Sequence, residues 1–557
     1  MAPTNANSNL LINPENGYCP QTKTYHTLRP KVPLPLSQSL SITQFLLSLP
    51  QTAAADVAFL INAFTGERLT YGQFLNQLQS LAFNLRTRFS LSKGDVAFIL
   101  LPSSFHVPAL YFSLLSLGVI ISPANPLASA SEISHQLHLT NPSIAFTTSH
   151  TSRKLPSNLR TVLIDSPDFI SMSTQTQNDL IDFTVPIVNQ ADSAAILYSS
   201  GTSGKVKGVL LTHRNLIALA ASFYHSESQT GSTEAQSSRE VTLSTVPLFH
   251  VYGFLGLMMT FTVTYTLVLM ERFDFEKMLK AIEKYRVSHM AVSPPLIVTL
   301  TKSELTKSYD LSSLQLLHSG GAPLGKEVTL KFKEKFPDVE LIQGYGMTES
   351  GGVGAGMRGP DEANRYGSVG RLYEFLEAKI VDPATGEALP PDEKGELWLR
   401  GITIMKVTSA GYVGDDKATA ETFSPDGWLK TGDLCYFDSH GFLFIVDRLK
   451  ELIKYKAYQV PPAELEHLLH SNHEIADAAV IPYSDEEAGQ IPMAFVVRRP
   501  GSNITAAQVM DFIAKQVAPY KKIRRVAFID SIPKSPAGKI LRRELVTRAL
   551  STNLSKL

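Results

Sequence analysis

Cysteine is scarce in this sequence. The 557 residues include two, Cys19 and Cys435, which lie far apart along the chain. Neither belongs to a cluster that could hold a metal. This usage is typical of a protein from a reducing compartment, and we expect no cysteine-bound metal site.

Excess charge is absent as well. The chain carries 51 Lys and Arg residues against 51 Asp and Glu residues, so its formal net charge is zero. Proteins that bind nucleic acid or anionic membranes by electrostatic attraction usually have a basic excess. We therefore expect no nucleic-acid partner.

Long uninterrupted apolar runs are also missing. Two uncharged tracts, residues 96–131 and 241–270, have the length of a membrane helix, but polar residues and prolines interrupt both. The interruptions are Pro102, Pro108, Pro123 and Pro126 in the first tract, and Pro247 and His250 in the second. We predict buried strand–helix units and no transmembrane segment. The polar residues 1–13 predict no secretory signal.

The remaining composition is that of a large globular protein. Apolar residues make up 44% of the chain and charged residues 18%. Strand-like runs such as residues 95–101 alternate with helical spacing, as in residues 70–89. This order predicts an α/β protein with partly parallel sheets. We expect a large domain of several subdomains over residues 1–447 and a small α/β domain over residues 448–557.

A glycine- and hydroxyl-rich stretch at residues 198–209 is the first functional signal. Glycines let backbone N–H groups approach an anion, hydroxyls add donors, and lysine adds positive charge. The stretch is not a Walker A loop, because Val206 follows Lys205 where that motif has Ser or Thr. It predicts a polyphosphate cradle, although a plain surface turn has a similar composition. The candidate residues are Ser199, Ser200, Gly201, Thr202, Ser203, Gly204 and Lys207.

Residues 343–350 are the second signal. Glycines flank Tyr345 and leave its ring free to lie against a base. Thr348 can donate a hydrogen bond to a phosphate, and Glu349 offers the oxygen ligand that Mg²⁺ prefers. The segment predicts a nucleotide site that includes Gln343, Gly344, Tyr345, Gly346, Met347, Thr348 and Glu349.

The order of the motifs, from about residue 59 to residue 543, resembles that of the adenylate-forming enzymes. This superfamily includes acyl-CoA synthetases, 4-coumarate–CoA ligases and firefly luciferases, and the chain is similar to its peroxisomal 4-coumarate–CoA ligase-like members. The later matching motifs are a ribose-binding turn that ends at Asp433, then Arg448, a hinge at Lys450, and a loop with the adenylation lysine, Lys539.

The resemblance implies the ligand contacts. Catalysis would involve Lys539, His250 and Glu349, and Mg²⁺ would contact Glu349 and Thr202. ATP would bind the residues of the two signals above together with Gly321, Ala322, Asp433, Arg448, Lys450, Lys454, Gln459 and Lys539. The acyl group would meet His250, Tyr252, Ser319 and Gly321, and coenzyme A would meet Arg272, Lys456 and Ala457.

The chain departs from the family pattern at four places. Lys205 and Val206 replace an apolar residue and a proline, and Ala457 replaces a glycine in the loop that lines the pantetheine tunnel. Phe254 follows shortly after Tyr252, where hydroxycinnamate enzymes usually have asparagine nearby. Trp398 lies in a segment where true 4-coumarate–CoA ligases commonly carry a cysteine. The missing asparagine favours a hydrophobic acid over a polar hydroxycinnamate.

The resemblance implies an ATP-dependent carboxylate–CoA ligase. It would form acyl-AMP and pyrophosphate, and then acyl-CoA and AMP after the small domain rotates about Lys450. The acid would be an aromatic propenoic acid, such as a cinnamate or coumarate, or a fatty or oxylipin acid. A luciferase-like oxygenase and a non-catalytic acyl- or nucleotide-binding relative are the alternatives. The final Ser555-Lys556-Leu557 is typical of a peroxisomal address and predicts an import receptor as partner.

Overall fold

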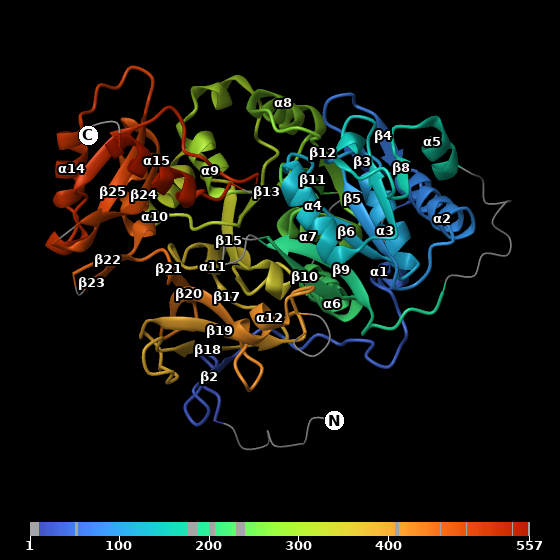
Figure 1. Cartoon of the computed structure of the whole chain (residues 1–557), viewed down its shortest axis with the longest axis horizontal. Coiled ribbons are helices and arrows are strands. Elements are labelled where there is room, and N and C mark those ends of the chain that lie inside the picture. Colours follow the sequence, from blue (N-terminus) through green and yellow to red (C-terminus); the bar gives the residue numbers. More distant parts are fainter. Residues whose placement is uncertain are drawn as a thin grey trace.

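The computed structural model describes residues 11–50, 54–174, 186–199, 206–229, 240–406, 411–456, 458–485, 487–536 and 538–554. Its strands form three sheets in one large body and a further sheet at one end of the molecule (Figure 1). We call the body up to strand β21 the large unit, and residues from β22 onward the small unit. The residues Ser200 to Gly204 of the predicted phosphate cradle, Ala457, and Ser555 to Leu557 lie outside the described residues.

The first sheet of the large unit is parallel through its centre. Strands β15, β14, β13, β11, β12 and β3 run in parallel, and antiparallel strands flank them at both edges. In spatial order the strands are β17 (Arg371–Leu372), β16 (Ala355–Gly356), β15 (Glu340–Tyr345), β14 (Leu316–Ser319), β13 (His289–Val292), β11 (Val241–Ser244), β12 (Thr266–Leu269), β3 (Ala58–Asn62) and β4 (Arg68–Thr70). Helices α7 (Val251–Val263), α8 (Phe275–Tyr285), α9 (Pro294–Lys302), α10 (Lys326–Lys335) and α11 (Gly359–Ala363) connect or follow these strands.

The second sheet contains the strand that leads into the phosphate cradle. Its order is β10 (Lys207–Thr212), β9 (Ser193–Ser199), β6 (Ile120–Pro123), β5 (Val96–Leu100), β7 (Ile144–Thr147) and β8 (Thr161–Leu163). The associated helices are α1 (Ile42–Ser48), α2 (Tyr71–Thr87), α3 (Val107–Ser116), α4 (Ala130–Thr140), α5 (Pro167–Ser173) and α6 (His213–Gln229). Helix α2 begins where the sequence predicts, because Thr70 and Gln73 form a capping box at its start.

An antiparallel sheet completes the large unit. It runs β1 (Tyr18–Cys19), β2 (Thr24–His26), β18 (Leu376–Val381), β19 (Gly395–Gly401), β20 (Leu429–Phe437) and β21 (Leu443–Arg448), with helix α12 (Asp416–Thr422) before β20. The short strands β1 and β2 join it from the beginning of the chain, more than three hundred residues before β18. Strands β20 and β21 pair so that Asp433 lies opposite Arg448.

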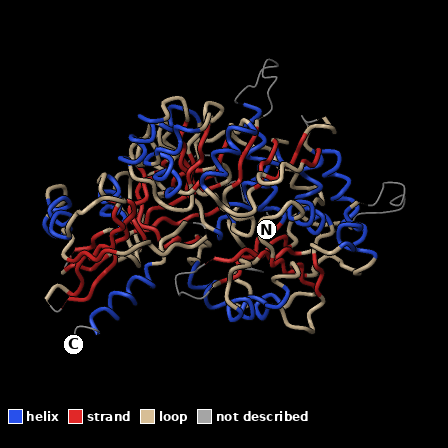
Figure 2. Tube along the Cα trace, turned by 90° about the horizontal axis from the view of Figure 1, so that it is seen from above, coloured by secondary structure: helices blue, strands red, loops and turns tan. Residues whose placement is uncertain are grey.

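The small unit has its own sheet and its own apolar core. Its strands are β22 (Ile453–Tyr455), β23 (Tyr458–Val460), β24 (Ile475–Asp485), β25 (Gly489–Arg498) and β26 (Arg525–Phe528), and its helices are α13 (Pro462–Ser471), α14 (Ala506–Ala514) and α15 (Arg542–Leu554). The buried clusters of this unit contain no residue of the large unit. Figure 2 shows these strands gathered at the end of the molecule that carries the C-terminus. The change of sheet falls between Arg448 and Ile453, and a domain boundary at residue 447 stays a prediction.

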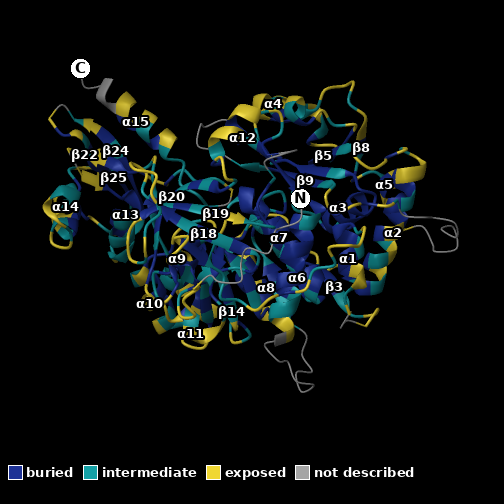
Figure 3. Ribbon diagram, turned by 90° about the horizontal axis from the view of Figure 1, so that it is seen from below, coloured by how far each residue is buried: buried dark blue, intermediate teal, exposed yellow. Residues whose placement is uncertain are grey.

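The two uncharged tracts prove to be buried strand–helix units. Residues 241–270 contain β11, α7 and β12, and residues 96–131 contain β5, α3 and β6. Within the described part of the chain, no helix is both long and apolar enough to cross a membrane. Figure 3 shows buried residues through the sheets and exposed ones on outer helices such as α4 and α14. The α/β class with partly parallel sheets is confirmed.

Candidate active site

A cavity of about 270 Å³ opens between the two units, beside the carboxyl ends of β14 and β15. Ligands of α/β proteins commonly bind at this edge, because loops from several parallel strands meet there. Segments that are far apart in sequence line this cavity together. From the predicted site they contribute Gly321, Ala322, Gly344, Tyr345, Gly346, Asp433, Arg448 and Lys539.

Asp433 is the central acceptor of the cavity. Its side chain is 4% exposed, and the Tyr345 hydroxyl donates to its Oδ2 at 2.6 Å. Arg448 Nε lies 3.0 Å from its Oδ1. The carboxylate raises the pKa of Arg448, while burial followed by the same charge raises the pKa of Tyr345. Tyr345 and Arg448 therefore hold the carboxylate in position from both of its oxygens. There it can accept hydrogen bonds from a ribose.

The glycines beside Tyr345 are required by close packing. A Cβ on Gly346 would lie 2.0 Å from the Gly352 carbonyl oxygen, and one on Gly344 would lie 3.0 Å from Nε2 of His318. A larger residue at Gly346 would force the backbone apart. The two glycines thus let the Tyr345 segment pack directly against the Gly352 backbone and the His318 ring.

Lys539 reaches the cavity from a tight loop between β26 and α15. The Ser535 backbone N–H donates to the Lys539 carbonyl at 2.8 Å, and the Lys539 N–H donates to Ser535 Oγ at 3.2 Å. Gly538 supports this turn at a φ of +81°, and a Cβ at this position would lie 3.0 Å from Ser293 Oγ of the large unit. Burial and the positive charge of Arg448 lower the pKa of Lys539 to about 8. The lysine is thus close to the nucleotide residues.

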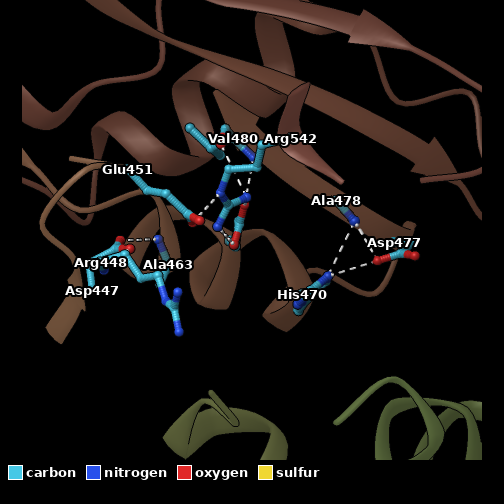
Figure 4. A network of polar contacts seen from close by, with 10 residues as sticks. Asp447, Arg448, Glu451, Ala463, His470, Asp477, Ala478, Val480 and Arg542 are labelled. Carbon is cyan, nitrogen blue, oxygen red and sulfur yellow. Dashed lines mark hydrogen bonds and ion pairs between the residues drawn. The ribbon is translucent and has the colours of Figure 1, made fainter. Parts of the chain in front are cut away.

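A buried ionic network connects Arg542, which follows the lysine loop, to Glu451 and to helix α13 (Figure 4). Arg542 Nε lies 2.9 Å from Glu451 Oε2, and the same guanidinium pairs with both oxygens of Glu466 on α13. Glu451 follows the predicted hinge directly, so this network joins hinge, helix and lysine loop. Asp447 accepts hydrogen bonds from the backbone of Arg448 and Ala463, and burial raises its pKa to about 7. Sequence reasoning did not predict Glu451 or Glu466, because partners so far apart in sequence cannot be matched from charge alone.

Glu349, in the segment 343–350, lies beside Ser199 at the end of β9. Its side chain is buried, and Ser199 Oγ and the Tyr412 hydroxyl each donate to its Oε1 at 2.9 Å. Lys207 Nζ lies 4.3 Å from the centre of the Tyr412 ring. Burial, together with the Glu349 charge, raises the pKa of Tyr412. Sequence reasoning missed Tyr412, which has no motif around it that points to a nucleotide.

These residues fit a magnesium ion held jointly with substrate. Within the described parts of the chain, no group of three or more His, Cys, Asp or Glu side chains is placed to hold a metal. Glu349 accepts both of its hydrogen bonds on one oxygen. Mg²⁺ commonly takes one or two carboxylates and completes its shell with phosphates and water. A single carboxylate beside a phosphate cradle is consistent with that pattern.

The predicted acyl residues lie at the start of α7 and the end of β14. His250 caps α7, with Nδ1 accepting from the Tyr252 N–H at 3.2 Å. Burial and the positive charge of Lys539 lower the pKa of His250 to about 4, so the ring is neutral near pH 7. The Tyr252 hydroxyl donates to the His318 carbonyl at 2.6 Å. Ser319 Oγ is buried and has no hydrogen-bond partner among the described residues, so it could serve a ligand.

Several predicted residues do not line this cavity. Lys454 and Gln459 pair across the β22–β23 hairpin and are exposed, as is Lys456. Arg272 is exposed between β12 and α8, and Lys450 is exposed in the turn after β21. Gln343, Met347 and Thr348 flank Tyr345 without lining the cavity. Their ligand contacts remain predictions.

Comparison with known proteins supports the resemblance to the adenylate-forming enzymes. The sequence pattern of the family described as AMP-binding enzyme matches residues 50–407, and that of the AMP-binding enzyme C-terminal domain matches residues 464–539. The protein called 4-coumarate–CoA ligase-like 9 of Arabidopsis thaliana is 56% identical over the full length of both chains. Peroxisomal OPC-8:0-CoA ligase 1 of the same plant is 43% identical, covering 97% of this chain and 98% of its own.

Solved structures show the same fold. The o-succinylbenzoate CoA synthetase of Bacillus subtilis in complex with its acyl-adenylate intermediate superposes with a TM-score of 0.74 at 26% identity, covering 90% of this chain and 97% of its own. The anthranilate CoA ligase AuaEII with anthranoyl-AMP reaches 0.80 at 23% identity, covering 93% and 99%. The predicted family and fold are therefore confirmed. The chain belongs to the AMP-binding enzyme family, as an AMP-forming acid–thiol ligase related to the 4-coumarate–CoA ligase-like proteins.

Proposed function

We propose that this enzyme joins a hydrophobic carboxylic acid to coenzyme A in two steps through an acyl adenylate. The observation that carries the proposal is the meeting of Tyr345, Asp433, Arg448 and Lys539 around one cavity. The adenine side, the ribose acceptor and a cation for the reacting centre then lie within reach of one nucleotide. Had these residues lined separate cavities, a single ATP could not use them together.

In the first step, the substrate carboxylate attacks the α-phosphorus of ATP and pyrophosphate leaves. Two anions must meet, so positioned positive charge should supply much of the rate. Lys539 and Arg448 provide this positive charge. The carboxylates of Glu451 and Asp433 offset the repulsion between the two cations. When bound at Glu349, Mg²⁺ would neutralise phosphate charge. The hydroxyls and glycines after Ser199, with Lys207, would hold the leaving pyrophosphate.

In the second step, the thiol of coenzyme A attacks the acyl carbonyl and AMP leaves. The thiol needs the space that Lys539 occupies in this structure. The small unit would therefore rotate about Lys450 and bring the β22–β23 hairpin, with Lys456 and Ala457, toward the cavity. Two features support this role for the hairpin: its residues Lys454, Lys456, Tyr458 and Gln459 are exposed, and it begins just after the hinge. Domain rotation of this kind is a common device in enzymes.

The acid is proposed to be an aromatic propenoic acid or a fatty or oxylipin acid. Phe254 and Leu255 are buried on α7 behind Tyr252, so the nearby wall is apolar. His250 is neutral and adds no charge that would attract a second carboxylate. The names of the relatives, one a 4-coumarate–CoA ligase-like protein and one an OPC-8:0-CoA ligase, fit both halves of this range.

A competition assay tests the proposal. The enzyme is given ATP, Mg²⁺, coenzyme A and an equimolar mixture of cinnamate-type, fatty and oxylipin acids, and the thioesters are identified by mass. We expect thioesters of apolar acids to dominate over those of hydroxylated cinnamates. Absence of both thioesters and acid-dependent ATP–pyrophosphate exchange would refute a ligase activity. Oxygen-dependent light emission with a luciferin would instead reveal a luciferase-like use of the adenylate.

We further propose peroxisomal import through Ser555-Lys556-Leu557. The name of one relative, a peroxisomal ligase, supports this. A fluorescent fusion that keeps these residues at its carboxyl end should enter peroxisomes, and the same fusion without Leu557 should stay outside. Equal distribution of the two fusions would contradict the assignment.

A further inference from the structure

Two lysines of the large unit reach across to the backbone of the small unit. Lys302, the last residue of α9, donates from Nζ to the Ile475 carbonyl at 2.7 Å. Lys331, on α10, donates from Nζ to the Ser471 carbonyl, also at 2.7 Å. Ser471 ends α13 and Ile475 begins β24, so both bonds hold the same corner of the small unit. In Figure 1, α9 and α10 lie on the side of the large unit that faces the small unit.

The Ser471 carbonyl, at the end of α13, is suited to a cation. The last carbonyls of a helix lack partners within the helix and carry the negative end of its dipole. The Asn472 amide, which follows α13, donates to the Leu469 carbonyl, and the Ser471 carbonyl accepts from Lys331. Burial, with the charges of Arg499 and Lys331, lowers the pKa of Lys302 to about 8. Its ammonium has lost water at this boundary, and the carbonyl bond replaces that hydration.

The surfaces around these bonds fit closely. Gly325, at the start of α10, leaves room for His467 of α13, since a Cβ there would lie 2.9 Å from His467 Cγ. A Cβ on Gly538 would lie 3.0 Å from Ser293 Oγ, where the lysine loop meets the large unit. The orientation that places Lys539 in the cavity is therefore the one in which both lysines reach their carbonyls.

We propose that Lys302 and Lys331 are positioning residues that hold the small unit in the adenylating orientation. The inference rests on the proposed two-step function. Rotation about Lys450 must break both bonds, because donors and acceptors lie on opposite sides of the boundary. The two lysines thereby set the balance between the half-reactions without touching ATP, acid or coenzyme A.

Variants that keep the apolar part of the side chain test this role. Lys302→Met, Lys331→Met and the double variant are compared with Lys333→Met, the matched control. Lys333 lies on the same helix as Lys331, but it donates to the Pro337 and Val339 carbonyls of its own unit. Thermal unfolding of each variant confirms that it is folded.

The measured quantity is the rate of adenylation divided by the rate of thioester formation. Adenylation is followed by ATP–pyrophosphate exchange, and thioester formation is followed from supplied acyl-AMP and coenzyme A. If the two orientations of the small unit interconvert rapidly, this ratio follows the equilibrium between them, whatever the ratio is in the parent enzyme. Loss of a hydrogen bond to a charged group should lower the ratio roughly tenfold for Lys302→Met, and less for the more exposed Lys331. Unlike Lys331→Met, Lys331→Arg keeps a charged donor at this position and should retain the ratio of the parent enzyme.

A structural readout complements the rates. Cys19 and Cys435 are buried, so nitroxide labels can be directed to Lys394→Cys on the large unit and Lys515→Cys on the small unit, both exposed positions. In the parent and in the Lys333→Met control, we expect the same main distance. In the double variant we expect a second population to grow.

An unchanged rate ratio and distance distribution in the double variant would overturn the proposal. An equal effect of Lys333→Met would overturn it as well, since it would show a general effect of removing charge. The proposed function fails differently, by the absence of acid-dependent exchange in the parent enzyme. In that case the label distances alone still decide whether the two lysines hold the small unit.

Discussion

Replacing Lys539 with alanine should stop acid activation and leave the second half-reaction intact. In the structure its ammonium belongs to the small unit and lines the same cavity as Tyr345 and Asp433, and burial strengthens its field. Losing one such preorganised group typically costs roughly 10²–10³ in rate, which we expect for adenylation. Thioester formation from supplied acyl-AMP should change little, since the lysine must leave the cavity for that step.

The depressed pKa of Lys539 adds a pH signature. With a pKa of about 8, the lysine is charged below that pH and loses its proton above it. The kcat/KM of adenylation, which reports the free enzyme, should therefore fall roughly tenfold between pH 7 and pH 9. Lys539→Arg should keep its charge throughout this range and lack the decline, although its absolute rate should be lower.

The assay separates the two half-reactions in one preparation. Pyrophosphate exchange reports adenylation, mass detection of acyl-CoA from synthetic acyl-AMP reports thioester formation, and circular dichroism checks the fold. Equal loss of both half-reactions in folded Lys539→Ala would refute the two-orientation account. A flat pH profile for the parent enzyme would refute the charge-based role.

Three further substitutions extend the test. Asp433→Asn should raise the KM for ATP and lower the unfolding temperature, because Arg448 loses its counter-ion; unchanged ATP binding by calorimetry would contradict the ribose assignment. Gly538→Ala should slow adenylation selectively, since its φ is positive and a Cβ would crowd Ser293 at 3.0 Å; pyrophosphate exchange measures this. Ala457→Gly should speed thioester formation, because it removes a methyl group from the predicted pantetheine tunnel; an unchanged rate of AMP release in stopped-flow measurements would contradict this.

Much of the fold could be predicted from local pattern. The capping box at Thr70 and the apolar spacing that follows it specify α2, and the proline-interrupted tracts specify strand–helix units. These signals are local, so a sequence displays them. The joining of β1 and β2 to β18 depends on pairing over hundreds of residues, and no local signal encodes it.

The candidate site also contains residues that the sequence predicts and residues that it does not. Tyr345 and Asp433 lie in glycine-containing motifs whose order reveals the family, and the structure brings both to one cavity. Tyr412, which donates to Glu349, has no such motif. Partners that meet only after folding, such as Glu451 and Arg542, cannot be paired from sequence, because many carboxylates could serve each guanidinium.

The pairing of Asp433 with Arg448 has a consequence for how the intermediate is kept. Arg448 is the last residue of β21, and this strand stays paired with β20 up to the point where the hinge begins. The anchor for the nucleotide thus stands on the stationary side of the pivot. An acyl-AMP held there need not be released and recaptured between the two steps. This mixed anhydride, which water would hydrolyse, therefore stays in place while the small unit rotates.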